Sequence, residues 1–186
     1  MNRTIHSVAV CALLGLVCVL PGLGQSDSLS ETTEWLQTNL GGAACAVFTM
    51  GKSQADLTQY TDGTEATFVN CEMTLETSST VGDLGNLGGY KVHLGKLDPA
   101  RIAITPGVKV PAGWLSFGDI PRSGIRLVTL RDEKLIDGRS EPQGGVETTA
   151  STFKAAEISI HVRDRESAQK LVDAFSRAIA LCRSIP

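Results

Sequence analysis

Histidine, aromatic residues and excess positive charge are all scarce in this sequence. Its 186 residues include 3 histidines, aromatic residues make up 5%, and the formal net charge is −3. A mildly acidic chain has no electrostatic reason to bind nucleic acid or an anionic membrane surface. The sequence also lacks a P-loop, a G-x-S-x-G nucleophile motif and a spaced set of zinc ligands. We therefore expect no cofactor, no metal ion, no catalytic residue and no bound nucleic acid.

Long apolar runs are also rare, and the one that stands out is Val8–Leu20 near the N-terminus. Arg3 precedes this run, and Pro21 and Gly22 end it. The run has the length of the apolar region of a signal peptide and is short for a segment that spans a bilayer. An uncleaved N-terminal membrane anchor is the alternative. We favour a signal peptide and expect the protein to be exported, either periplasmic or secreted.

Small residues after the apolar run predict where the signal peptide is removed. Gly22 and Gly24 occupy the −3 and −1 positions of a cut before Gln25, and a cut after Ser26 fits nearly as well. No later segment is apolar enough to cross a membrane, so we expect a soluble mature chain without a membrane span. The remaining length suits one domain. The expected organisation is a signal peptide over 1–24 and a single domain over 25–186.

Cysteine is sparse once the signal peptide is removed, because only Cys45, Cys71 and Cys182 remain. In an oxidising compartment two of them are expected to form a bridge, and one thiol is left over. Cys71 falls on the apolar face of a predicted strand, and Cys182 falls on the apolar stripe of a predicted helix. We favour a structural Cys71–Cys182 disulfide for that reason, with Cys45–Cys71 as the main alternative.

Helical signals occur at both ends of the mature chain. Ser28 followed by Glu31 has the spacing of a capping box, and Gly41 and Gly42 are expected to stop a helix that runs from about 29 to 39. After Asp164, which is a good N-cap, apolar residues recur at spacings of three and four. These residues are Ala168, Leu171, Val172, Phe175, Ala178, Ile179 and Cys182.

Between the two helices the pattern is that of β-strands. The segment 66–79 alternates, and its apolar face consists of Val69, Cys71, Met73 and Leu75. The glycine-rich segment 81–90 is expected to be a mobile hairpin loop, and 137–147 a polar loop. Further strands are predicted at 44–50, 90–97, 100–105, 113–119, 124–132 and 151–162.

The order of elements is therefore a helix, about seven strands and a long amphipathic helix. The apolar stripe of the last helix must be buried, and a sheet is the available partner. Closure of the sheet would also protect strand edges from aggregation. The predicted class is α+β, mainly β. We expect a curved antiparallel sheet or a partly open barrel, with the N-terminal helix and the long C-terminal helix packed on it.

Two segments carry a resemblance to a known family, "VHLGKLDPARI" at 92–102 and "ISIHVRDRESAQKLVDAFSRAIALC" at 158–182. Over the last two-thirds of the mature chain, the sequence resembles the PH-like barrel domains of small exported bacterial proteins of unknown function. The resemblance implies a PH-like barrel plugged by a helix, and a binding or scaffolding role with no known reaction. A phosphoinositide site in such a barrel needs a basic cluster in the first hairpin. Here Lys52 stands beside Asp56 and Asp62, so no phosphoinositide site is expected.

The glycines of "VGDLGNLGGY" (81–90) raise the question of a phosphate-binding loop. A dinucleotide fingerprint needs G-x-G-x-x-G between a strand and a helix, because the N-terminus of that helix binds the pyrophosphate. Here the spacing is G-x-x-G-x-x-G and a strand pattern follows. We therefore expect no phosphate binding at this segment.

His93 and His161 are the histidines that remain after cleavage, and each lies between apolar neighbours in a predicted strand. Alternation points both side chains away from those neighbours, toward solvent or an outer helix. We expect an exported non-enzymatic binding or protein-interaction module whose partner is an unknown protein, peptide or small apolar ligand. Exposed apolar surface near Trp114 and Phe117 would support this function. The alternative is a periplasmic or secreted hydrolase that uses His93 or His161 with a nearby acid.

Overall fold

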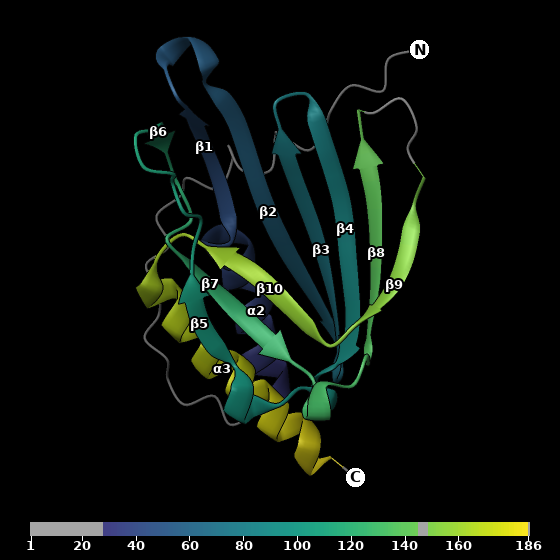
Figure 1. Ribbon diagram of the computed structural model, residues 1–186. Coiled ribbons are helices and arrows are strands. Elements are labelled where there is room, and N and C mark those ends of the chain that lie inside the picture. The colour runs from purple at the N-terminus through teal and green to yellow at the C-terminus, as the bar shows by residue number, and fades with distance from the viewer. Residues whose placement is uncertain (1–27, 145–148, 186) are drawn as a thin grey trace.

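The computed structural model describes residues 28–144 and 149–185 (Figure 1). Two helices, α2 (Leu29–Ala43) and α3 (Arg165–Ser184), enclose a series of antiparallel strands in the chain order. The predicted α+β class, with a helix at each end of a mainly β domain, is confirmed. The predicted signal peptide and its cleavage point lie outside the described residues.

Ten strands form two antiparallel sheets in the described residues. The larger sheet has the order β6-β1-β2-β3-β4-β8-β9, and the smaller has the order β10-β7-β5. Figure 1 shows the smaller sheet and α3 gathered at the lower end of the larger sheet, beyond which the upper ends of β1 to β4 extend. Neither sheet closes into a barrel, so the open-sheet form of the prediction holds. The strands are β1 (Cys45–Gly51), β2 (Thr58–Val69), β3 (Glu72–Val81), β4 (Leu84–His93), β5 (Ala103–Pro106), β6 (Leu115–Gly118), β7 (Ser123–Val128), β8 (Ile136–Gln143), β9 (Ser151–Ala155) and β10 (Glu157–Val162).

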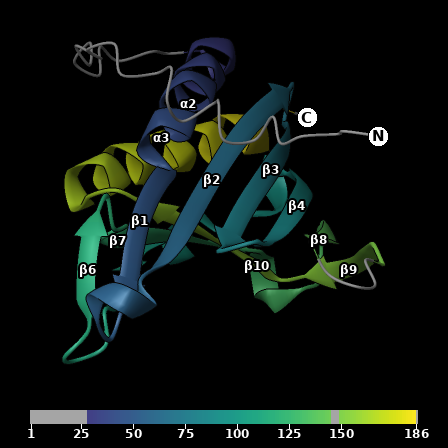
Figure 2. The ribbon, with the colours of Figure 1, turned by 90° about the horizontal axis from the view of Figure 1, so that it is seen from above.

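Helix α3 supplies much of the core. The side chain of Asp164 caps it by accepting a hydrogen bond from the Ser167 amide at 2.8 Å. Figure 2 shows α3 running crosswise to β1 and β2, with α2 beside it, and the two helices are in contact. The predicted stripe is confirmed except for Val172, which is only half-buried. Its buried members are Ala168, Leu171, Phe175, Ala178, Ile179 and Cys182.

A disulfide joins the end of α3 to the hairpin between β2 and β3. Cys71 and Cys182 are bonded, with their Cα atoms 5.6 Å apart and a sequence separation of 111. Both side chains are buried in the core. The favoured pairing is therefore the one that the structure has, and the Cys45–Cys71 alternative is wrong.

The first helix is longer than predicted. Ser28 caps it as expected, since its hydroxyl accepts a hydrogen bond from the Glu31 amide at 3.3 Å. However, Gly41 and Gly42 lie inside α2, and the Ala44 amide closes the last turn on the Leu40 carbonyl at 2.8 Å. Buried packing of Leu40 and the close approach to β2 outweigh the low helix propensity of the two glycines.

The predicted strand at 66–79 is two strands joined by a tight turn. Asn70 adopts a left-handed conformation, with φ at 54°, and separates β2 from β3. Asparagine tolerates this region better than most residues do. Because the chain reverses here, Val69 is 70% exposed and does not share the buried face of Cys71, Met73 and Leu75.

The glycine-rich segment is mostly strand and not a hairpin loop. The turn is confined to Gly82 and Asp83, and β4 begins at Leu84. Gly88 and Gly89 are buried in the sheet because neighbouring side chains occupy the space above them. A Cβ atom at Gly88, for example, would lie 2.5 Å from the Thr77 hydroxyl oxygen. These glycines therefore serve close packing between strands.

Two further boundaries differ from the prediction. The segment 137–147, expected as a polar loop, supplies most of β8, because its polar side chains lie on an exposed sheet face. The predicted last strand, 151–162, divides at Ala156 into β9, which joins the larger sheet, and β10, which joins the smaller one. The alternation of Ile158, Ile160 and Val162 holds, and all three are buried.

Candidate functional site

The larger sheet has one covered face and one open face. Strand alternation places on the covered face the buried residues Ala66, Met73, Leu75, Val92 and Ile136. We call the opposite side the outer face. Every described side chain on it is exposed or half-buried, and the only buried positions are Gly51 and Gly89.

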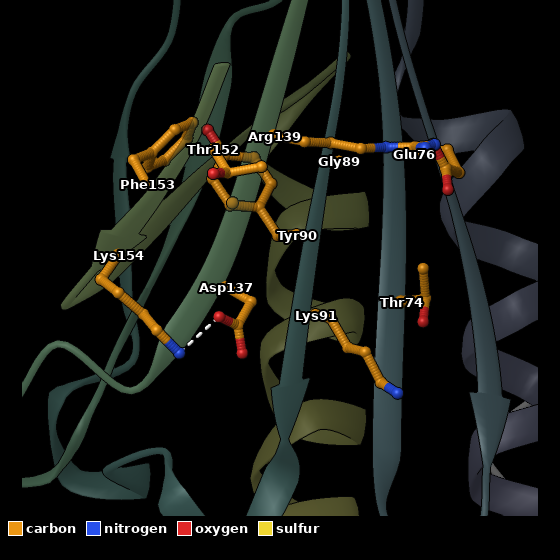
Figure 3. A pocket seen from close by; sticks show the side chains of 11 residues that line it. Thr74, Glu76, Gly89, Tyr90, Lys91, Asp137, Arg139, Thr152, Phe153 and Lys154 are labelled. Carbon is orange, nitrogen blue, oxygen red and sulfur yellow. Dashed lines mark hydrogen bonds and ion pairs between the residues drawn. The ribbon is translucent and has the colours of Figure 1, made fainter. Parts of the chain in front are cut away.

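The strand register divides the central part of the outer face into three cross-strand rows. The lower row consists of Thr74, Lys91, Asp137 and Lys154. The middle row consists of Glu65, Glu76, Gly89, Arg139 and Thr152. The upper row consists of Cys45, Gly63, Ser78, Leu87 and Glu141. Figure 3 shows most of the lower and middle rows as two lines of side chains.

A first hollow of about 490 Å³ involves the lower and middle rows. Its charges are matched locally. Lys91 pairs with Glu72 at 2.7 Å, and Lys154 pairs with Asp137 on the neighbouring strand. The hydrogen bond to Glu72 raises the pKa of Lys91 above its usual value. Exposed pairs of this kind add little stability, but they leave the first hollow without a strong net field.

Arg139 bridges two strands across the glycine between them. Its guanidinium donates to the Glu76 carboxylate at 2.5 Å, and Figure 3 shows the side chain extended over Gly89. A Cβ atom at Gly89 would lie 2.9 Å from the Arg139 Nε atom. Glycine at this position therefore allows the ion pair to lie flat on the sheet. The same pair contributes to the next hollow and so marks the boundary between the two.

A second hollow of about 710 Å³ lies along the middle and upper rows. Its lining includes the small residues Gly63 and Ser78 and the half-exposed side chain of Leu87. Four carboxylates and two guanidinium groups also line it, those of Glu65, Glu76, Asp119, Glu141, Arg139 and Arg163. The second hollow is therefore lined by small side chains and by more carboxylates than guanidinium groups. The charges of the first hollow, by contrast, are paired locally.

An apolar patch lies at the β6 edge of the outer face. Phe117 is 52% exposed and Leu115 is 38% exposed, and the register places both on the same face as Val47 of β1, which is 40% exposed. We call these three residues the edge patch. Trp114 behaves differently, because it packs against the buried cluster of Ala46, Phe48 and Met50. Of the two aromatic residues whose exposure would support a binding role, Trp114 is therefore packed and Phe117 is exposed.

The two histidines occupy separate environments. His161 on β10 forms a hydrogen bond through Nδ1 with the Asp62 carboxylate at 2.6 Å. This bond raises the pKa of His161 above its usual value, against the opposing effect of partial burial. His93 accepts a weak hydrogen bond from the Gly95 amide at 3.2 Å. Neither histidine lines either hollow, so the hollows bring together none of the side chains of the hydrolase alternative.

Sequence reasoning did not identify the residues of the outer face. The alternation of 66–79 leaves Glu76 off the predicted apolar face, but Arg139 and Glu141 fall within 137–147, which the sequence predicts as a polar loop. The signal was present in "IDGRSEPQ" (136–143), where Asp137, Arg139 and Glu141 alternate with smaller or apolar residues. Period-two alternation of this kind is typical of a strand with one solvated face.

The described residues contain neither a candidate metal site nor a candidate membrane-spanning helix. Within residues 28–144 and 149–185, no group of three or more histidine, cysteine, aspartate or glutamate side chains could hold a metal ion. In the same ranges neither helix is long and apolar enough to cross a membrane. Comparison with protein-family models, curated proteins and solved structures found no match.

Proposed function

We propose that this protein is an exported, non-enzymatic binding module that contacts a partner protein through its outer face. The observation that carries the proposal is the edge patch. Val47, Leu115 and Phe117 are exposed apolar side chains on one face of neighbouring strands, at the edge of a sheet face whose side chains are all exposed or half-buried. Aromatic side chains exposed in this way commonly anchor protein interfaces.

Export is part of the same proposal. The signal-like run Val8–Leu20 supports it. The buried Cys71–Cys182 disulfide also supports it, because such bonds persist in oxidising compartments. Production of the full chain in a bacterial host, followed by fractionation and N-terminal sequencing, tests export. A mature N-terminus near Gln25 in the periplasm or the medium supports it, and an intact Met1 in the cytoplasm contradicts it.

The binding role is tested by cross-linking the purified protein to envelope and secreted fractions. Leu115→Ser with Phe117→Ser should abolish capture of a specific protein, because the substitution removes the apolar anchors and leaves the backbone pairing of β6 intact. Leu130→Ser with Ile185→Ser is the matched control, since both side chains are exposed and lie outside the larger sheet. Equal capture by the patch variant and the wild type would contradict the proposal.

A second candidate function is hydrolysis with His161 as a general base. The 2.6 Å contact with Asp62 favours it, since a carboxylate can fix the tautomer and orientation of a catalytic imidazole. The described residues provide no serine, threonine or cysteine bonded to this histidine. Turnover of p-nitrophenyl esters that disappears in His161→Ala would support hydrolysis. If the wild type and His161→Ala hydrolysed the esters at the same rate, hydrolysis by His161 would be contradicted.

A further inference from the structure

The two hollows of the outer face differ in charge balance. In the first hollow Lys91 and Lys154 each have a carboxylate partner. In the second, the Arg139–Glu76 pair neutralises itself, and the guanidinium of Arg163 donates to the Gly42 carbonyl at 3.2 Å. The three carboxylates that remain in the second hollow form no ion pair within the described part of the chain. They are Glu65, Asp119 and Glu141.

The shape of the second hollow suits an extended chain that lies across the strands. Glu65 is on β2 and Glu141 is on β8, three strand spacings away. At about 4.8 Å per spacing the two strands are about 14 Å apart, which is about four residues of an extended peptide. Alternate side chains of such a peptide point the same way, so basic residues at positions i and i+4 would face both carboxylates.

The floor of the second hollow favours lysine or arginine over a compact cation. Gly63 and Ser78 have small side chains and allow a peptide backbone to approach the sheet. Leu87 is 39% exposed on the same floor and can cover the aliphatic stem of a basic side chain while its charged end meets a carboxylate.

We propose that the second hollow binds an extended, lysine- or arginine-rich segment of the partner protein. Charge complementarity selects this occupant, since the hollow holds four carboxylates against two guanidinium groups. The inference gives the chemistry of the partner in the proposed function and so rests on it. The edge patch would then bind apolar side chains of the partner at the β6 side, and the second hollow would bind its basic segment.

The probe is a fluorescent heptapeptide of alternating lysine and threonine, titrated into the purified protein by anisotropy. Its counterpart has glutamate in place of lysine. We expect the basic peptide to bind and the acidic peptide not to bind. Raising NaCl from about 50 mM to about 300 mM should weaken binding several-fold, because the screening length becomes shorter than the spacing between exposed charges.

The variant that tests the site is Glu65→Gln with Glu141→Gln, which keeps the side-chain shapes and removes two charges. We expect affinity for the basic peptide to fall at least about tenfold. Glu34→Gln with Glu133→Gln is the charge-matched control, because both residues are exposed and lie outside the outer face. This control should bind within about twofold of wild type, and thermal melts should show that both double variants fold.

Three outcomes would overturn the inference. They are no binding of the basic peptide, equal weakening by the two double variants, and equal binding of the acidic peptide. If the partner is still captured through the edge patch in that case, the proposed function stands and its partner chemistry is wrong. If the peptide binds through Glu65 and Glu141 but no partner is captured, the hollow is real and the edge patch has another role.

Discussion

Asp62 on β2 and His161 on β10 join the two sheets through a hydrogen bond of 2.6 Å. Strand β2 belongs to the larger sheet and β10 to the smaller one, so this contact links the two sheets. The residue opposite His161 on the neighbouring strand β7 is Gly124, which has no side chain. Asp62 is the charged group that changes the pKa of the His161 imidazole. The pair is therefore a polar contact between the two sheets.

This contact predicts a pH-dependent contribution to stability. The bond with Asp62 raises the pKa of His161 in the folded state. The ion pair is therefore fully present below the unfolded histidine pKa of about 6.5, and it is lost as pH rises through the higher folded pKa. Because the imidazole is nearly half exposed, we expect Asp62→Asn to cost no more than about 1 kcal/mol at pH 5.5, and less at pH 9.

Urea denaturation at the two pH values measures that difference. An NMR titration of the His161 ring should also show its pKa falling toward the usual value in Asp62→Asn. Glu72→Gln is the control, since it removes an exposed carboxylate that pairs with Lys91 instead. A cost of Asp62→Asn that grows as pH rises would contradict the assigned ion pair.

The disulfide should account for a large part of the stability of the fold. Its sequence separation of 111 predicts a loss of about 4 kcal/mol when Cys71 and Cys182 are both replaced by serine. Urea denaturation under oxidising conditions measures the loss. Non-reducing digestion with mass spectrometry should recover a peptide pair that contains Cys71 and Cys182. A pair that contains Cys45 and Cys71 would contradict the structure.

Much of the fold could be predicted from periodicity and end signals. The apolar stripe of α3 repeats with helical spacing from Ala168 to Cys182, which is about four turns, so the buried face of the helix followed directly from the sequence. The cap at Ser28 and the facing directions of Cys71 and Cys182 followed in the same way. In each case the pattern of a single segment is enough for the prediction, and no knowledge of which distant segments pair is needed.

The errors occurred where distant strands decide the local structure. Gly85, Gly88 and Gly89 have the composition of a loop, but β3 and β8 pair with them on both sides. Only that pairing shows that glycine is needed beneath Thr77 and Arg139. The outer face was missed for the same reason, because its hollows arise from the register of six strands and from no single segment.

A third prediction concerns Gly138, which lies beneath an aromatic ring. A Cβ atom there would lie 2.3 Å from the Phe153 ring, and that ring meets Tyr90 edge to face at 6.0 Å. We expect Gly138→Ala to cost about 1 to 3 kcal/mol, since the Phe153 ring, although 40% exposed, must move off Gly138 and away from Tyr90. Adding Phe153→Ala should restore part of that loss, because the clash disappears with the ring. Urea denaturation of the wild type, the two single variants and the double variant measures the coupling, and additive losses would contradict the packing of the ring on Gly138.

A fourth prediction tests the dependence of the fold on α3. Phe175 is fully buried between the helices and the sheets, so Phe175→Ala should cost about 3 to 5 kcal/mol by leaving a cavity. Phe175→Leu keeps most of the volume and should cost less than about 1.5 kcal/mol. Ala180→Ser, on the exposed side of the same helix, is the control and should stay within about 0.5 kcal/mol of wild type. If Phe175→Ala were as mild as this control under chemical denaturation, the apolar stripe would not be buried against the sheets. The covered and open faces of the larger sheet would then be wrongly assigned, and the binding surface with them.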